Sequence, residues 1–315
     1  MTSTLVEIPF KTFQNRDGTQ SPIHMDVHIP PSATPANPAP VLLWWHGGAL
    51  VQGSRKGLAP HFRQAPQLHN ICVVAPDYRL APQVRFPTIL TDVVDALNYL
   101  ATPAFAEATD GKVDTSRIIL AGSSAGGWLA LLAGTGIAVE NLHVRERIKA
   151  IAAIYPMSTL NDSFWTTKQR PLSYAENGRI YEAREQAGAL DEEGPIVTSV
   201  TLDSPRGAFF MYITQEAILP ELLLKGTNLD AAHFGVPDGL RAGLVESMPP
   251  TFIIHGDADD KVPIRQATQV VDAAHEAGFK DVIFETAAGQ NHMYDLAPDQ
   301  TMDSLYTFVN RVLVQ

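Results

Sequence analysis

No charged residue lies between Ile118 and Val139, and this run of 22 residues holds the sequence Gly122-Ser123-Ser124-Ala125-Gly126 near its start. An uncharged run of this length is long enough to cross a bilayer as a single helix. Five glycines in the run argue against that interpretation, because glycine destabilises a helix interior. We therefore expect no membrane span, but a buried strand that turns sharply into a buried helix.

The pattern Gly-x-Ser-x-Gly between a strand and a helix predicts a nucleophile elbow. Arg117–Ala121 is typical of a strand that enters the pattern, and a helical pattern leaves it. The turn would lift the hydroxyl of Ser124 above the sheet and set the Ala125 N–H at the helix N-terminus, facing an oxyanion. Gly122 and Gly126 would shape the turn, because side chains there would collide. The alternative is a Gly/Ser-rich turn without chemistry.

The composition indicates a globular protein with a sizeable core, since 45% of its 315 residues are hydrophobic and 18% are charged. Its formal net charge of -11 argues against nucleic acid and against an anionic membrane surface as partners. The single cysteine, Cys72, excludes an internal disulfide and a cysteine-rich metal site. The first residues lack the apolar stretch of a signal peptide, so we expect a cytoplasmic protein.

Short apolar strands alternate with helical patterns along most of the chain, and the clearest helical patterns span residues 90–100 and 302–313. Such alternation predicts an α/β fold, with a mostly parallel sheet covered by helices on both faces. Two further segments, Leu5–Phe10 and Met25–Ile29, are expected to pair antiparallel at one edge. The predicted buried strands are Val41–Trp45, Ile71–Ala75, Arg117–Ala121, Ile148–Tyr155, Thr251–His255 and Val282–Thr286.

The alternation fails between residues 161 and 250, where turn signals and short helical patterns replace strong strands. This stretch holds 7 basic and 13 acidic residues, so its net charge of -6 is more than half of the total of -11. We expect residues 161–250 to form an inserted, solvated cap. Residues 1–160 and 251–315 would form the catalytic core.

A second glycine-rich turn follows the strand Val41–Trp45, in the sequence His46-Gly47-Gly48-Ala49. Small residues let backbone N–H groups face a bound carbonyl, and a fold with a nucleophile elbow takes its other oxyanion donors from this place. We expect the N–H groups of Gly48 and Ala49 to donate there, with Gly47 shaping the turn. His46 precedes the serine in the chain and is expected to be structural. A plain glycine-rich turn is the alternative.

A serine nucleophile needs an adjacent base, and that base needs an orienting acid. With a nucleophile elbow, the acid and then the histidine follow the serine along the chain. His292 lies in a loop just after the last predicted strand, in Gly289-Gln290-Asn291-His292, and is the expected base. The other candidates are His143, His233, His255 and His275.

Three carboxylates compete for the role of the acid. The strand Thr251–His255 leads into Gly256-Asp257-Ala258-Asp259-Asp260-Lys261-Val262-Pro263. Asp259 holds the expected turn position, Asp260 is the second choice and Asp257 the third. His255 is expected to be a packed neighbour of this loop. A metal site at the three carboxylates lacks converging His or Cys ligands, so we expect no metal.

Five ordered segments resemble the hormone-sensitive-lipase-like carboxylesterases of the α/β-hydrolase fold. The resemblance covers the chain outside the insertion and implies a cap over the active site. In the second segment, Asp77 and Arg79 look like a structural pair. The segments are His46-Gly47-Gly48, Asp77-Tyr78-Arg79-Leu80-Ala81-Pro82 with Phe86-Pro87, Gly122-Ser123-Ser124-Ala125-Gly126-Gly127, Gly256-Asp257-Ala258-Asp259 and Gly289-Gln290-Asn291-His292.

The chain departs from this family in three places. Ala49 stands where the family usually has a third glycine, and Ser123 stands where it usually has Asp or Thr. The acid segment continues with Asp260-Lys261-Val262-Pro263 instead of Pro-Leu, which is closer to the wider fold.

The ordered residues and the resemblance together predict ester hydrolysis through an acyl-enzyme, with Ser124 as nucleophile, His292 as base and Asp259 as acid. The expected substrate is a small-molecule ester with a short or medium acyl chain, and no cofactor is needed. Apolar residues of the insertion are expected either to line the substrate pocket or to form the core of the cap: Phe164, Trp165, Phe209, Phe210, Met211 and Tyr212.

Other activities stay open at this point. An amidase, a peptidase or a lactonase would use the same three residues. A lyase or a ligand receptor on this fold is disfavoured, because such members usually lack the acid or the base. Family analogy alone suggests a homodimer through Val282–Thr286 and Met302–Leu313.

Overall fold

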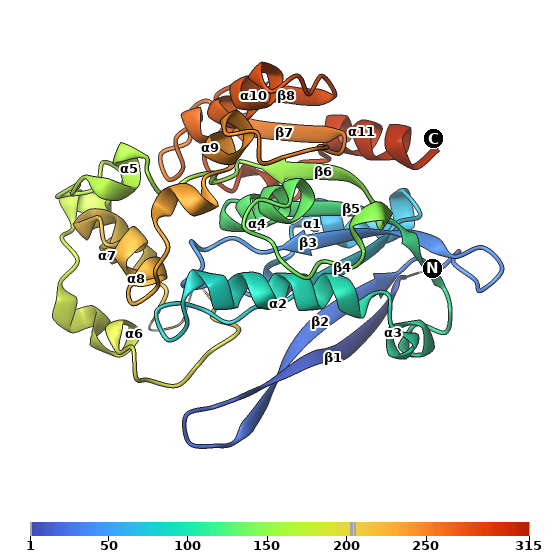
Figure 1. The fold of residues 1–315 in the computed structure, drawn as a ribbon, viewed down its shortest axis with the longest axis horizontal. Helices are drawn as coiled ribbons and strands as arrows, with labels where there is room; N and C mark the ends of the chain where they lie inside the picture. The colour runs from blue at the N-terminus through green and yellow to red at the C-terminus, as the bar shows by residue number, and fades with distance from the viewer. Residues whose placement is uncertain (1, 202–203, 205, 315) are drawn as a thin grey trace.

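The computed structural model describes residues 2–201, 204 and 206–314. Among these residues, eight strands form one sheet in the order β1-β2-β4-β3-β5-β6-β7-β8 (Figure 1). β1 (Thr4–Gln14) and β2 (Gln20–Ile29) pair antiparallel at one edge, and β2 also runs antiparallel to β4 (Cys72–Pro76). The predicted antiparallel edge is confirmed.

All the other strand pairs are parallel, and each predicted strand is present. β5 begins at Val113 rather than at Arg117, because its first residues pair with the start of β3. Central β5 lies between β3 and β6, and β8 forms the far edge. The parallel strands are β3 (Ala39–Trp45), β4, β5 (Val113–Ser123), β6 (Ile148–Ile154), β7 (Thr251–Gly256) and β8 (Val282–Ala287).

Helices cover both faces of the sheet, as the alternating pattern predicts. One face packs against α2 (Phe86–Tyr99), α4 (Ala125–Thr135) and α10 (Arg265–Glu276). The opposite face packs against α1 (Pro60–Leu68) and α11 (Asp303–Val314). A short helix, α3 (Pro103–Ala108), precedes β5.

The uncharged run forms the inner part of β5 and the whole of α4. Every residue from Ile118 to Thr135 is buried. A helix that is apolar on all sides belongs in the interior, and α4 is enclosed by the sheet, α2 and α9 (Val236–Arg241). In the described part of the chain, no helix has both the length and the apolar character to cross a membrane.

The insertion consists of short helices and irregular segments. α5 to α8 lie together on the left of Figure 1, beside one end of the sheet. α9 belongs elsewhere, because it packs against α4 and α10 and therefore extends the core layer. The four helices that lie together are α5 (Ser163–Thr166), α6 (Ala187–Leu190), α7 (Phe209–Glu216) and α8 (Leu219–Leu224).

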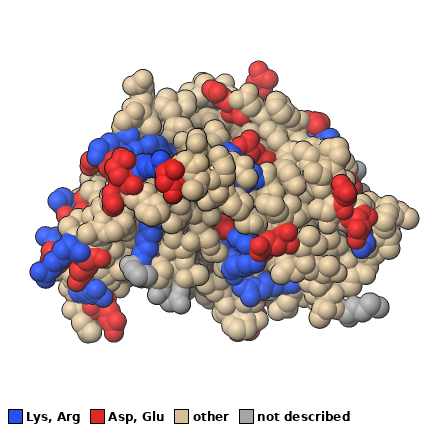
Figure 2. All heavy atoms as spheres, turned by 90° about the horizontal axis from the view of Figure 1, so that it is seen from below, with Lys and Arg blue, Asp and Glu red and all other residues tan. Residues whose placement is uncertain are grey.

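Charged side chains form mixed groups on the surface. On the face seen in Figure 2, Lys and Arg atoms adjoin Asp and Glu atoms. In the insertion, Lys168 and Arg170 both pair with Glu216, at 2.9 and 3.0 Å, and Lys225 pairs with Glu192 at 2.7 Å. Part of the negative charge of the insertion is therefore neutralised locally.

The charged residues of the segment after β4 do not form the predicted pair. Asp77 accepts hydrogen bonds from the backbone N–H (2.7 Å) and the guanidinium of Arg55. Arg79 instead donates from Nη2 to Asp92 of α2, at 2.7 Å. The prediction that Asp77 and Arg79 pair is wrong, because each finds its counter-charge on a different element.

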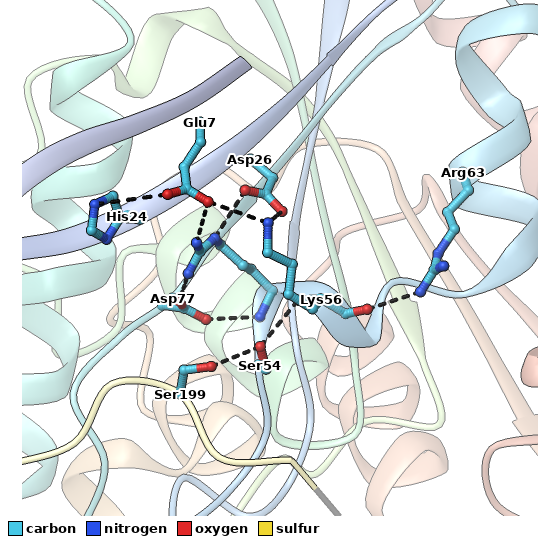
Figure 3. A network of polar contacts seen from close by, with 9 residues as sticks. Glu7, His24, Asp26, Ser54, Lys56, Arg63, Asp77 and Ser199 are labelled. Carbon is cyan, nitrogen blue, oxygen red and sulfur yellow. Dashed lines mark hydrogen bonds and ion pairs between the residues drawn. The ribbon is translucent and has the colours of Figure 1, made fainter. Parts of the chain in front are cut away.

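Arg55 is the centre of a partly buried ionic cluster that ties four segments together. Figure 3 shows its carboxylate partners Glu7, Asp26 and Asp77. Besides Asp77, its guanidinium contacts Glu7 of β1 at 2.6 Å and Asp26 of β2 at 2.9 Å. Asp26 is 2% exposed and Asp77 1% exposed. Burial alone would lower the pKa of Arg55, but the three carboxylates outweigh it and raise the pKa above its usual value.

We predict that Arg55→Met lowers the free energy of unfolding by about 3–5 kcal/mol, because it leaves two buried carboxylates with too little counter-charge. Urea denaturation followed by circular dichroism measures the change. Lys112→Met is the matched control, because it removes a cation from the exposed pair with Asp110 and is expected to cost less than about 1 kcal/mol. Equal, small effects of the two substitutions would contradict the role given to Arg55.

Candidate active site

Ser124 lies at the turn between β5 and α4, in a backbone conformation that L-residues rarely adopt. Its φ is 58° and its ψ is -121°. Hydrogen bonds hold the turn on both sides. The Ser124 N–H donates to the Ile154 carbonyl at 2.9 Å, and the Ser124 carbonyl accepts from Trp128 and Met157 N–H groups at 3.2 Å each. Such strain persists only where the surroundings determine the conformation.

The glycines of the two turns sit where a side chain would collide with backbone. A Cβ at Gly122 would overlap the Gly126 carbonyl, and a Cβ at Gly126 would overlap the Trp45 carbonyl. A Cβ at Gly47 would lie 3.0 Å from the Cβ of Ser124. The contacts therefore agree with the expected turn-shaping roles, and they bring the loop after β3 directly against the serine.

The loop after β3 turns through a run of positive φ angles: 104° at Gly48, 51° at Ala49 and 64° at Leu50. The Gly48 carbonyl closes this turn by accepting from the Val51 and Gln52 N–H groups, at 3.0 and 3.1 Å. Within the described residues, the N–H groups of Gly48, Ala49 and Ala125 donate no hydrogen bond. Three amides beside Ser124 are thus available to an oxyanion.

His46 packs against the backbone of this loop. Its ring stacks on Tyr78 at a centroid distance of 4.2 Å, and its Nδ1 lies 2.8 Å from the Gly47 carbonyl. Burial lowers the pKa of His46 to about 4, so the ring is neutral at pH 7 and Nδ1 donates to the carbonyl. This geometry agrees with the expected structural role.

His292 and Asp259 are directly paired. The imidazole Nδ1 lies 2.7 Å from Oδ2 of Asp259, whose other oxygen accepts from the Lys261 and Val262 N–H groups at 2.9 Å each. Burial alone would raise the pKa of Asp259, but hydrogen bonds from His255 and His292 outweigh it and hold the pKa well below its usual range. The carboxylate is therefore ionised at neutral pH, and Nδ1 of His292 carries the proton.

The three acids of this loop have different partners. Asp257 accepts from the Gly289 N–H at 2.6 Å, and Asp260 accepts from the side chain of Asn291 at 3.0 Å. Both contacts fix the loop that carries His292, while Asp259 reaches the imidazole itself. The geometry thus favours Asp259 over Asp260 and Asp257 as the acid.

His255 contacts the acid more closely than expected. Its side chain is fully buried, with Nε2 at 3.2 Å from Oδ2 of Asp259 and 2.8 Å from the Val262 carbonyl. Its Nε2–H donates to the Val262 carbonyl and also lies against the carboxylate of Asp259, so His255 is a polar neighbour of the acid. Its position at the end of β7, four residues before Asp259, is the only sequence signal for this contact.

Ser124 and His292 line one cavity of about 610 Å³, together with the loop after β3. No direct hydrogen bond joins their side chains among the described residues, although such bonds often tighten only when substrate is bound. Core residues Trp44, Tyr155 and Leu296 line one part of the wall, and the insertion supplies Val200. An isolated bridge between Gly53 and Val200 fixes the insertion over the loop.

Of the predicted pocket residues, only Phe210 and Met211 are among those that line this cavity. Trp165 and Phe209 are fully buried, and Phe164 and Tyr212 pack against the core. These four residues are not among those that line this cavity, and they pack in or against the hydrophobic core that covers one face of the sheet. On α7, Phe209 faces the core with Ile213, one turn later.

A family model described as alpha/beta hydrolase fold matches residues 42–190, and a model of the prolyl oligopeptidase family matches residues 238–315. Both matched regions contain part of the site. The chain has the α/β-hydrolase fold. The match also confirms the resemblance to hormone-sensitive-lipase-like carboxylesterases that the ordered motifs carry.

Two curated relatives of this chain differ greatly in length. Over 143 residues, 45% of this chain and 42% of the relative, it is 34% identical to an ethyl acetate hydrolase of Pseudomonas putida. Over 94% of the chain it is 28% identical to the non-reducing polyketide synthase stbA of Stachybotrys bisbyi, of which it spans 14%. The chain thus spans only a small part of the polyketide synthases that it matches.

Solved structures share the fold at low identity. A Staphylococcus aureus protein of unknown function superposes with a TM-score of 0.71 and 19% identity, covering 98% of this chain and 99% of that one. Esterase 2 of Thermogutta terrifontis with butyrate bound gives a TM-score of 0.62 and 18% identity, over 98% and 92% of the two chains. These likenesses confirm the α/β-hydrolase fold.

The low pKa of Asp259 predicts a pH-dependent contribution to stability. A folded-state pKa below the unfolded value of about 3.9 stabilises the fold above that pH, and the contribution is lost as the pH falls below it. We expect Asp259→Asn to lower the free energy of unfolding by about 1–3 kcal/mol at pH 6. The difference from wild type should shrink between pH 4 and pH 2.5, measured by urea denaturation. Asp260→Asn is the control, and a difference for Asp259→Asn that does not change with pH would contradict the assignment.

Proposed function

We propose that this protein is a hydrolase that cleaves carboxylic esters through an acyl-enzyme on Ser124. The observation that carries the proposal is one cavity lined by a strained serine, by Gly48 and Ala49, and by a histidine that is paired with a buried carboxylate. The N–H groups of Gly48, Ala49 and the adjacent Ala125 donate no hydrogen bond within the described residues. This set supplies a nucleophile, an oxyanion site, a base and an orienting acid, which acyl transfer requires. None of these roles needs a metal or an organic cofactor.

The first half of the reaction forms the acyl-enzyme. Because Asp259 keeps the proton of His292 on Nδ1, the Nε2 lone pair is free to take the proton of Ser124 as its Oγ attacks the ester carbonyl. The N–H groups of Gly48, Ala49 and Ala125 stabilise the oxyanion. The intermediate collapses when the imidazolium of His292 protonates the leaving alcohol.

The second half returns the enzyme to its starting state. A water molecule attacks the acyl carbon and gives its proton to His292 Nε2. The same amides stabilise the second oxyanion. When this intermediate collapses, Ser124 takes the proton back and the carboxylic acid leaves.

The cavity favours a neutral ester with a short or medium acyl chain. Its volume of about 610 Å³ lies within the range of small-molecule sites, and its lining is mostly apolar. The two lysines in its wall are already ion-paired, Lys56 with Asp26 and Lys261 with Asp260, both at 2.7 Å. The names of the ethyl acetate hydrolase and the butyrate-bound esterase support such a substrate.

Amide hydrolysis is the second candidate, because the prolyl oligopeptidase model matches the part of the chain that holds Asp259 and His292. An amide needs stronger protonation of its leaving group than an ester does. A paired set of nitrophenyl esters and nitroanilides with the same acyl groups separates the two activities. We expect turnover of the esters, with a maximum at short or medium acyl length, and preferential turnover of the anilides would favour the amidase.

We predict that Ser124→Ala lowers kcat on p-nitrophenyl butyrate by at least about 10³-fold, because it removes the nucleophile. Ser123→Ala is the matched control, since it makes the same change one residue earlier. Its hydroxyl accepts from the Trp44 indole at 3.1 Å, so we expect a loss of no more than about tenfold. Near-normal turnover by Ser124→Ala would refute the proposed function.

A further inference from the structure

A second buried carboxylate lies close to His292 and takes no part in the proposed acyl transfer. Asp295 is fully buried in η6 (Tyr294–Leu296), three residues after His292, and it lines the same cavity. One of its oxygens accepts from the Tyr155 hydroxyl, and the other lies 3.3 Å from Nε2 of His61. A buried carboxylate is costly unless its partners are well placed, so a loop used only for packing gains little from one.

Tyr155 connects Asp295 to the imidazole of the proposed base. It directly follows β6 with a φ of 36°, and its N–H donates to the Ile254 carbonyl at 2.7 Å. Its ring centroid lies 4.5 Å from that of His292. Burial, together with the negative charge of Asp295, raises the pKa of Tyr155 well above its usual value. The hydroxyl is therefore neutral and donates to the carboxylate.

His61 anchors the other side of Asp295 to the helix layer. It lies on α1 with a side chain that is 1% exposed, and its Nδ1 is 2.9 Å from the Tyr306 hydroxyl on α11. Asp295 thus joins η6 to two helices and to the end of β6. Asp257, Asp259 and Asp260 contact residues 289 to 292 of the loop. Asp295 fixes the chain three residues after His292.

We infer that Tyr155 and Asp295 are positioning residues for His292, an inference that rests on the proposed function. Asp295 fixes the Tyr155 ring through the hydroxyl and fixes η6 through His61. The fixed ring limits rotation of the imidazole about its hydrogen bond to Asp259. This restriction keeps Nε2 directed at Ser124. Neither residue exchanges a proton with the substrate.

The test compares Tyr155→Phe and Asp295→Asn with wild type on p-nitrophenyl butyrate. Each is expected to lower kcat about 10- to 100-fold while KM stays within about twofold, because misplacing the base affects the chemical step rather than binding. The double variant should lose no more than the worse single variant, since the two residues act as one unit. Melting temperatures establish that each variant is folded.

Tyr294→Phe is the matched control, because the Tyr294 hydroxyl is buried without a hydrogen-bond partner among the described residues. We expect its kcat to stay within about twofold of wild type. Wild-type kcat in folded Tyr155→Phe, an equal loss in Tyr294→Phe, or a rise in KM with unchanged kcat would overturn the inference. If Asp295→Asn does not fold, Tyr155→Phe decides alone.

Failure of the proposed function is distinguishable from failure of this inference. It would appear as absent ester turnover by wild type or as full turnover by Ser124→Ala. The positioning role is then judged from ¹³C relaxation of the His292 ring by NMR. A more mobile ring in Tyr155→Phe than in wild type and Tyr294→Phe would support the inference. Equal ring mobility in all three proteins would refute it.

Discussion

The backbone of Ser124 is held at a φ of 58°, and the rest of the site depends on this one strained residue. The conformation is stable because the surrounding backbone leaves no alternative: the Ile154 carbonyl binds its N–H, and the glycines on either side allow β3, β5 and α4 to meet without side chains. The long uncharged run has the same origin. A turn so tightly determined must lie within a packed interior, where a charge would be costly.

The parallel sheet brings the remaining groups to this turn. Residues that follow β3, β5, β7 and β8 meet at the carboxyl-terminal ends of these parallel strands, as is usual for sites in open α/β folds. Each loop is then fixed by a separate set of contacts. His46 and the bridge to Val200 fix the loop after β3, and the acidic loop after β7 holds the His292 loop at three points. The Arg55 cluster joins the segment after the β3 loop to β1 and β2.

Local patterns predicted the elements well and the contacts between distant segments poorly. All eight strands, the sharp turn at Ser124 and the contact between Asp259 and His292 follow from apolar runs, glycine spacing and chain order, which are local properties. The pairs Asp77–Arg55 and Arg79–Asp92 were missed, because neighbouring charges in the sequence found partners on other elements. The burial of Trp165 and Phe209, the His255 contact and the Tyr155–Asp295 pair likewise depend on packing that no single segment encodes.

We propose that the strained turn makes Ser124 the one serine of the chain that His292 activates as a nucleophile. Reaction with a fluorophosphonate followed by peptide mass spectrometry tests this most directly, because the reagent needs an activated serine but no particular acyl or alcohol group. We expect one adduct per chain, on Ser124, with labelling strongly slowed in His292→Ala. An adduct on Ser123 or another serine, or labelling of Ser124 that does not depend on His292, would contradict it.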